Sequence, residues 1–238
     1  MRWPRFPWGL VCLPPIVKQL ILDLSLRAEP NLDNFVAGRN AEALQALREL
    51  VTGGLREPVV YLFGAPGSGR THLLRAVVGS YAQGRARYVA ADPGNSLPDP
   101  LPELVAWDDV NQLDEAGQAH LFGLQIRLRE SGGVLLCSGD VAPARLALRA
   151  DVVTRLAAGV AYPLHVLADE DKAEAVARHA ELRGFRLGRD VIGYLLRRHA
   201  RDLPALIGML AALDRYSLET KRPITLPLLR ELLAEPDS

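Results

Sequence analysis

A short apolar run that enters a glycine-rich loop constrains this chain more than any other stretch of its sequence. The run is Val59–Phe63, and the loop that follows reads Gly-Ala-Pro-Gly-Ser-Gly-Arg-Thr over residues 64–71. An apolar-periodic segment leaves the loop from His72, so the stretch reads as strand, loop and helix. Its spacing follows the phosphate-binding pattern G-x-x-x-x-G-K-[ST], with Arg70 in place of the lysine. The stretch therefore predicts a phosphate site between this strand and this helix.

The residue types in the loop suit a phosphate group. Glycines let the backbone turn its N–H groups inward around an anion, and the helix that follows adds the positive end of its dipole. Arg70 supplies a permanent cation for the outer phosphates, and the Thr71 hydroxyl can bind Mg²⁺. An ordinary strand-to-helix turn is the alternative, but three glycines followed by a cation and a threonine argue against it. The predicted nucleotide-binding residues of the loop are Gly64, Gly67, Ser68, Gly69, Arg70 and Thr71.

Binding and hydrolysis are separate questions at such a loop. Arginine is wider than lysine, planar and forked, and does not replace it freely at a tight phosphate site. We therefore expect a site with Arg70 to hold a nucleotide well and to cleave it poorly.

Composition limits the class of protein. The 238 residues are 49% apolar and 24% charged, which predicts one folded domain of moderate size, with or without an appendage. The 28 basic and 28 acidic side chains cancel, whereas a dedicated DNA- or membrane-binding protein usually carries a basic excess. The two cysteines, Cys12 and Cys137, are far apart and show no metal-ligand spacing, which suits a reducing cytoplasm. No apolar run reaches membrane-spanning length, so we expect a cytoplasmic protein with no membrane partner.

The N-terminal residues differ from the rest of the chain. Residues 1–17 are rich in tryptophan and proline and lack the long apolar core of a signal peptide, so we expect a disordered tail. An alternative is that they are translated upstream sequence and that the protein starts at Val17. Residues 19–24 alternate in polarity and predict an edge strand or an extended peptide that is free to dock on a partner.

Strands and helices alternate through the middle of the chain. Asn40 is expected to cap a helix that Gly53 and Gly54 end, and Asp114 to cap a longer helix that runs to about Glu130. The strands are nearly all apolar, which predicts a parallel sheet covered on both faces. The predicted strands are residues 59–63, 86–90, 104–107, 133–137 and 160–166, and two short helical pieces are expected at residues 144–148 and 152–157.

After the last strand the pattern becomes helical. Apolar residues recur at helical spacing in four segments, which begin at Asp169, Asp190, Asp202 and Leu226. The pattern predicts a small helical bundle of roughly 70 residues.

Acidic and hydroxyl residues follow two of the predicted strands. Asp108 and Asp109 end one strand, where an open parallel sheet presents its ligand crevice. Asp108 is the candidate Mg²⁺ ligand and Asp109 the candidate residue that orients an attacking water, the alternative for Asp109 being a cap on the next turn. Ser138 and Asp140 end the neighbouring strand and are candidates for sensing a terminal phosphate, although turn residues around Gly139 explain them as well.

Five segments together resemble one family. They look like the corresponding motifs of the bacterial replication initiator DnaA, a member of the AAA+ ATPases, over about residues 32–233. The resemblance implies an AAA+ α/β module with a five-stranded parallel sheet (residues 32–166) and a C-terminal helical lid (residues 167–238), after an N-terminal tail (residues 1–31). The matching segments are residues 34–38, the phosphate loop, Asp108-Asp109, residues 138–140 and residues 151–156.

Within that group the chain is most similar to the Hda family, regulatory inactivators of DnaA. The sequence stops after the lid without the DNA-binding domain of the initiator, and its loop carries Arg70, as loops of that family can. Residues 19–24 look like the short peptide with which Hda docks on the replicative sliding clamp. The implied clamp-binding residues are Gln19, Leu20, Leu22 and Leu24.

The resemblance implies a mechanism. Arg155 matches the finger arginine of the family and would act in trans, in the nucleotide site of ATP-bound DnaA, to promote hydrolysis there. Val36 would contact the chain's own nucleotide, either ADP or ATP with Mg²⁺, which would hold the conformation rather than be consumed. The implied partners are DnaA and the β sliding clamp of DNA polymerase III, with DNA reached only through the clamp; a homo-oligomer stays open. The result would be negative regulation of replication initiation.

One departure from the family pattern concerns the lid. The family usually places an arginine at the start of the third lid helix, where this chain has Pro204. A proline is tolerated in the first turn of a helix, so the fold survives, but one phosphate contact is lost. Together with Arg70, this makes vigorous intrinsic ATPase activity less expected.

Two other functions remain open at this point. A DnaC-like ATPase that loads a replicative helicase would use ATP tightly and would not need Gln19 and Leu20. A nucleotide-independent adapter would bind no nucleotide and would be unaffected by Arg155→Ala.

Overall fold

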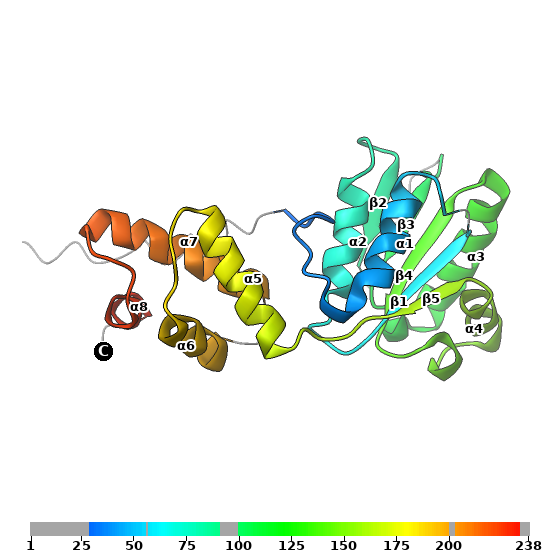
Figure 1. Ribbon diagram of the computed structural model, residues 1–238. Coiled ribbons are helices and arrows are strands. Elements are labelled where there is room, and N and C mark those ends of the chain that lie inside the picture. Colours follow the sequence, from blue (N-terminus) through cyan, green and yellow to red (C-terminus); the bar gives the residue numbers. More distant parts are fainter. Residues whose placement is uncertain (1–28, 56, 91–99, 200–202, 234–238) are drawn as a thin grey trace, which may run out of the picture.

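The computed structural model describes residues 29–55, 57–90, 100–199 and 203–233. Five parallel strands form one sheet in the order β2-β3-β4-β1-β5. Figure 1 shows this sheet and its helices on one side of the molecule and the remaining helices on the other. The predicted α/β class is confirmed. The strands are β1 (Val59–Phe63), β2 (Ala86–Val89), β3 (Leu104–Trp107), β4 (Val134–Gly139) and β5 (Val160–Pro163).

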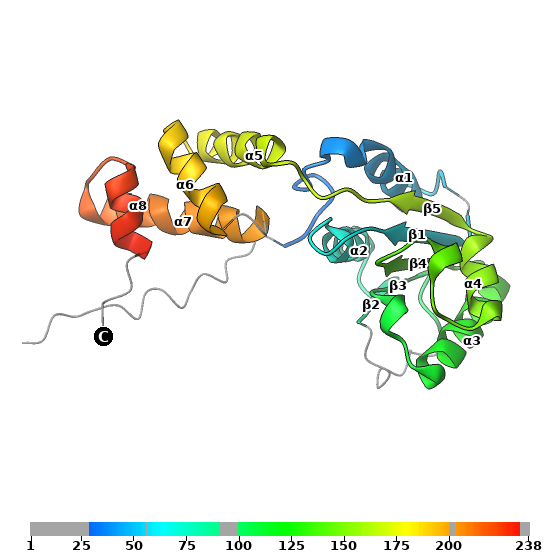
Figure 2. The same ribbon diagram turned by 90° about the horizontal axis from the view of Figure 1, so that it is seen from below.

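The three central strands, β1, β3 and β4, are buried on both faces because apolar side chains alternate between two cores. Val60 and Leu62 of β1 pack with helices α1 (Ala41–Val51) and α2 (Arg70–Gly79). Tyr61, between them, packs on the opposite face with α3 (Glu115–Ser131) and α4 (Ala150–Ala157). Figure 2 shows these two helical layers on either side of the strands. Helix α2, which follows the phosphate loop, and α4 therefore lie on different faces of the sheet.

Several predicted boundaries hold and several shift. Asp114 caps α3 by accepting a hydrogen bond of 2.8 Å from the Gly117 N–H. Asn40 occupies the N-cap position of α1, as predicted, but its side chain makes no capping bond. Its amide instead pairs with the backbone of His165, beyond the end of β5.

Further boundaries also differ from the predicted ones. β4 extends to Gly139, and β5 ends at Pro163, earlier than expected. The expected helical piece at residues 144–148 is only a 3-10 turn, Pro143–Arg145.

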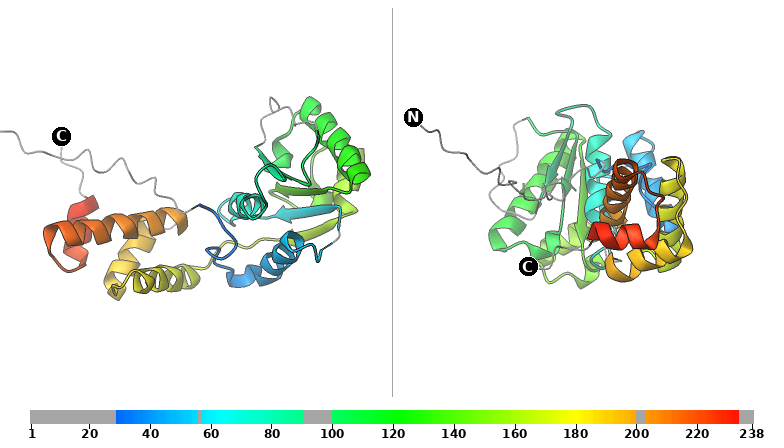
Figure 3. Two further views of the ribbon diagram at one scale, coloured as in Figure 1. Left: turned by 90° about the horizontal axis from the view of Figure 1, so that it is seen from above. Right: turned by 90° about the vertical axis from the view of Figure 1, so that its left-hand side faces the viewer.

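The four C-terminal helices form the lid with a core of its own. They are α5 (Asp169–Leu182), α6 (Arg189–His199), α7 (Leu203–Thr220) and α8 (Leu226–Leu233). Buried residues of all four helices meet in one cluster, Val176, Leu195, Leu210 and Leu228 among them. Figure 3 shows the lid beside the α/β part, joined to it by the segment between β5 and α5. Pro204 lies in the first turn of α7, where proline is tolerated.

Some predictions fall outside the described residues. They concern the N-terminal tail and the peptide containing Gln19, Leu20, Leu22 and Leu24. Among the helices that the structure describes, none is both long and apolar enough to cross a membrane.

Candidate functional site

The loop after β1 has a backbone that only glycine allows at two points. Gly67 (φ +83°) and Gly69 (φ +94°) lie in the left-handed region. A Cβ at Gly69 would come within 2.6 Å of the Phe35 ring, and one at Gly64 would overlap the Leu164 carbonyl oxygen. Helix α2 begins at Arg70, directly after the loop. The chain therefore folds into a tight loop with a helix N-terminus behind it, which is the arrangement that binds phosphate.

Buried polar atoms in this loop are left without hydrogen bonds. The Oγ of Ser68 and the Nη1 of Arg70 are buried, and within the described part of the chain neither makes a hydrogen bond. A buried polar group without a partner costs about 1–3 kcal/mol, so the Ser68 hydroxyl at a phosphate loop is suited to a phosphate oxygen. Thr71 is exposed at the start of α2, within reach of solvent. The residues present fit a nucleotide phosphate chain.

Arg70 reaches from the loop to the end of β3. Its Nη1 lies 3.1 Å from Oδ1 of Asp109, with only 12% and 29% of the two side chains exposed. Burial raises the pKa of the Asp109 carboxyl, and the Arg70 guanidinium acts in the opposite direction. The Asp109 side chain makes no capping bond to the 3-10 turn that follows, so the alternative role as a cap is not the one observed.

Asp108 lies behind this ion pair and is buried. One of its carboxylate oxygens accepts a hydrogen bond from the Tyr88 hydroxyl at 2.8 Å, and the other accepts one from the Ser138 hydroxyl. The Ser138 oxygen in turn accepts a 2.9 Å bond from the Asp109 N–H. Ser138 is therefore engaged with both acidic residues. The structure places it behind the crevice, and a direct phosphate contact stays a prediction.

The predicted Mg²⁺ ligands, Thr71 and Asp108, also remain a prediction. Within the described residues no group of three or more histidine, cysteine or acidic side chains gathers as a metal site. A Mg²⁺ held by few protein atoms and by phosphate oxygens needs no such group.

Asp140 follows β4 and is exposed. Its charge contributes to raising the pKa of Tyr61, for which burial is the first cause. The Tyr61 hydroxyl donates to the Val141 carbonyl at 3.0 Å and packs so close to Gly139 that a side chain there would overlap it. This contact holds the turn that presents Asp140 at the same edge of the sheet as the loop.

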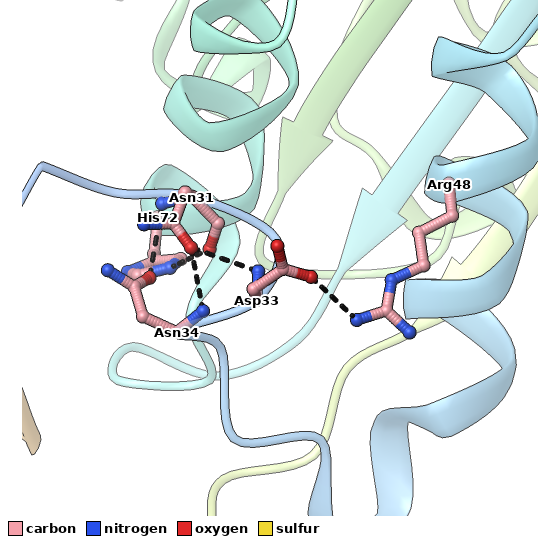
Figure 4. A network of polar contacts seen from close by, with 5 residues as sticks. All are labelled: Asn31, Asp33, Asn34, Arg48 and His72. Carbon is pink, nitrogen blue, oxygen red and sulfur yellow. Dashed lines mark hydrogen bonds and ion pairs between the residues drawn. The ribbon is translucent and has the colours of Figure 1, made fainter. Parts of the chain in front are cut away.

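A turn before α1 fastens the N-terminal segment beside the loop (Figure 4). The Asn31 side chain accepts from the N–H groups of Asp33 and Asn34 at 3.0 and 2.7 Å, and the Asn31 carbonyl lies 3.1 Å from His72 Nε2. Asp33 pairs with Arg48 of α1 at 3.2 Å. The turn is thus tied to both α1 and α2.

The next residues carry this turn to the phosphate loop. The Phe35 ring lies 5.6 Å from the His72 ring, centroid to centroid, and covers Gly69. Val36 follows and is half-buried, so the predicted nucleotide contact lies next to a residue that touches the loop.

Arg155 lies apart from this constellation. It belongs to α4, on the sheet face opposite α2, and is half-buried. Its guanidinium carbon is 4.4 Å from the centroid of the Phe122 ring of α3, and its carbonyl accepts a bond from Gln125. Arg155 therefore does not serve the chain's own phosphate loop in this structure.

Comparison with known proteins agrees with this fold. Residues 169–233 match the family described as "Hda, lid domain". An uncharacterized protein of Haemophilus influenzae is 33% identical over 228 residues, which covers 91% of this chain and 98% of that one. Domain III of Thermotoga maritima DnaA superposes with a TM-score of 0.70 at 22% identity, over 87% of this chain and 96% of that one.

The C-terminal part of this chain is an Hda-type lid, and the chain has the fold of DnaA domain III. AMPPCP-bound DnaA of Aquifex aeolicus has the same fold, with a TM-score of 0.64 at 21% identity over 81% of this chain and 66% of that one. The predicted fold, a five-stranded parallel α/β module followed by a helical lid, is thereby confirmed.

Two site residues escaped the sequence analysis. Tyr88 donates to Asp108, and Phe35 covers the glycine next to Arg70. Tyr88 lies on β2, beside β3, and only the strand order brings it to Asp108. Phe35 stood within a recognised motif, but nothing in its spacing indicated a contact with Gly69.

Proposed function

We propose that this DnaA-related AAA+ protein promotes hydrolysis of DnaA-bound ATP while it is tethered to the sliding clamp, and so restrains initiation of replication. The Hda-type lid and the DnaA-like fold support a partner of the DnaA class. AAA+ modules of one fold can pack head to tail, so that a side chain of one subunit enters the nucleotide site of its neighbour.

The placement of Arg155 carries the proposal. It lies on the face away from its own phosphate loop and is half-exposed. An arginine supplied in trans stabilises charge on the transferred phosphoryl group, and this raises the rate by about 10³–10⁵-fold, or about 4–7 kcal/mol.

The contact with Phe122 opposes this role only weakly. A guanidinium over an aromatic ring at an exposed site is worth about 0.5–1 kcal/mol. That is a small part of the stabilisation expected in a partner's site, so Arg155 can leave the ring when a partner binds. In the free protein the ring holds the side chain at the surface of α3 and α4.

The chain's own loop would hold a nucleotide through Ser68, Arg70 and Thr71 and the loop N–H groups. The bound nucleotide would supply negative charge that satisfies these buried donors and steadies the loop. The buried Ser68 hydroxyl, which makes no hydrogen bond within the described residues, argues against an adapter that has lost its nucleotide site.

Hydrolysis of labelled ATP preloaded on DnaA tests the proposal. The protein with clamp-loaded DNA is expected to accelerate hydrolysis, and Arg155→Ala to abolish the acceleration. Arg155→Lys, which keeps the charge but not the planar fork, is expected to restore little. The double variant Gln19→Ala, Leu20→Ala is expected to lose the part of the acceleration that depends on the clamp. Retained clamp binding by that variant would contradict the proposed tethering.

A further inference from the structure

The charges of the lid are distributed unevenly along its sequence. Residues 169–174, at the start of α5, contain four acidic residues and one lysine. Residues 178–198, which run from the second half of α5 into the last turn of α6, contain six arginines and two acidic residues. The balance of charge over the whole chain therefore does not exclude a basic segment in the lid. Its arginines, all exposed, are Arg178, Arg183, Arg186, Arg189, Arg197 and Arg198.

Two exposed arginines meet at one aromatic ring where α6 packs against α8 (Figure 1). The ring belongs to Tyr194 of α6, and its centroid is 6.0 Å from the guanidinium carbon of Arg198, one turn later on the same helix. The guanidinium carbon of Arg230, on α8, is 5.5 Å from that centroid. Nη1 of Arg198 also donates a hydrogen bond of 3.4 Å to the Tyr194 hydroxyl. The half-buried ring thus holds two guanidinium groups at the surface, and we call Arg198 and Arg230 the arginine pair.

The arginine pair has no acidic partner among the residues that the structure describes. Two other exposed arginines of the lid do have one: Arg183 lies 3.9 Å from Asp214, and Arg222 lies 2.8 Å from Glu231. Two like charges held beside one ring repel each other, and an anion that meets both of them relieves the repulsion. The arginine pair is therefore suited to an anionic partner.

The surroundings of the arginine pair favour a nucleic-acid backbone over a protein surface. A peptide would find no exposed large apolar side chain on the described parts of α6 and α8 to bury beside the charges. DNA phosphates need none, because they are bound by charge and by the planar donor fork of arginine. Both guanidinium groups lie over the Tyr194 ring, so the ring is not open for a base to stack on, and this favours a duplex over a single strand.

We infer that the arginine pair binds the phosphate backbone of double-stranded DNA directly and without regard to base sequence. This contact is additional to the one through the sliding clamp that the family resemblance implies. Under the proposed function the duplex that passes through the clamp lies close to the tethered protein. The contact itself needs neither the clamp nor DnaA, so it is measured with the full chain alone.

Fluorescence anisotropy of a labelled DNA duplex, titrated with the full chain at several salt concentrations, tests the inference. The logarithm of the binding constant falls linearly with the logarithm of the salt concentration, by about 0.9 for each phosphate neutralised. The double variant Arg198→Gln, Arg230→Gln keeps much of each side chain but not its charge, and it should reduce the slope by about two. A duplex of different sequence should bind with the same affinity and slope, because backbone contacts carry no sequence information.

The double variant Arg183→Gln, Arg222→Gln is the matched control. It removes the same net charge from two exposed arginines of the lid, but each of these already faces an acidic side chain. Its slope should differ from that of the wild type by less than about one. Urea denaturation checks that both double variants are folded. If the variant of the arginine pair does not fold, the two single variants repeat the test, and each should reduce the slope by about one.

Four results would overturn the inference. They are no binding of the duplex at low salt, an unchanged slope for the variant of the arginine pair, an equal loss of slope in the control, and competition by polyglutamate that matches unlabelled duplex charge for charge. The last result would indicate an acidic protein partner instead. Failure to stimulate hydrolysis on DnaA would refute the proposed function and leave these measurements intact.

Discussion

Replacing Asn40 with alanine should destabilise the junction between the α/β part and the lid. The Asn40 side chain is buried, with 2% of the residue exposed, and pairs with the backbone of His165 in two directions. Its Nδ2 donates to the His165 carbonyl at 2.9 Å, and its Oδ1 accepts from the His165 N–H at 2.7 Å. The side-chain amide thus donates to and accepts from one backbone residue after β5, as a residue of a neighbouring strand would.

The magnitude follows from these two bonds. Each contributes about 1 kcal/mol net, and a buried backbone group left unpaired costs about 1–3 kcal/mol. His165 is only half-buried, so water can replace part of what alanine removes. We expect Asn40→Ala to lower the free energy of unfolding by about 2 kcal/mol.

Urea denaturation of the variant and the wild type measures this change, provided that the slope with denaturant is unchanged. Asn40→Asp is the matched control, because it keeps the acceptor for the His165 N–H and loses only the donor. Asn40→Asp should lower the free energy of unfolding by more than half as much as Asn40→Ala, because the new carboxylate also faces the His165 carbonyl. A change below about 0.5 kcal/mol for Asn40→Ala would refute the reasoning, because that is the range of neutral surface substitutions.

Two further predictions concern the site. Gly69→Ala should abolish nucleotide binding, because the added Cβ would clash with the Phe35 ring. Gly84→Ala is the control: Gly84 has a similar φ (+85° against +94°), but an added Cβ would meet no atom within 4 Å. This control should bind nucleotide normally, and its urea denaturation measures the cost of the backbone strain alone. Loss of binding in both variants would rule out the steric explanation. Burial and the hydrogen bond to Asp108 raise the pKa of Tyr88 from 10.0 to about 12. The stability that Tyr88 contributes to the folded state is therefore complete below pH 10, and it is lost as the pH rises toward 12, because the unfolded chain ionises first. Tyr88→Phe should therefore lose less stability than the wild type over that interval, and an equal loss would contradict the shift.

Much of the fold could be predicted because the signals are local. The central strands are apolar runs, Asp114 precedes a helical pattern, and the three glycines of the loop indicate a tight turn. The 3-10 turn at Pro143–Arg145 was mistaken for part of a helix because a short apolar pattern does not distinguish the two.

What could not be predicted depends on contacts between distant segments. Asparagine is a residue type that often caps helices, but the hydrogen-bond partner of Asn40 is His165, which lies 125 residues away in the sequence. Arg70 and Asp109 were each recognised as site residues, yet their pairing depends on β3 and β1 being separated by β4. The hydrogen bonds that the Ser138 and Tyr88 hydroxyls donate to Asp108 depend on the same strand order.

A single-turnover measurement tests the central claim most directly. Labelled ATP is bound to DnaA, the protein is added at saturating concentration with clamp-loaded DNA, and the hydrolysis rate constant and the affinity for DnaA are obtained from the same titration. Arg145→Ala, an exposed arginine just before α4, serves as the control. Arg155→Ala should reduce the rate constant by about 10³-fold or more with affinity changed only a few-fold, while Arg145→Ala should match the wild type. An undiminished rate constant for Arg155→Ala, or a loss of affinity alone, would contradict the account.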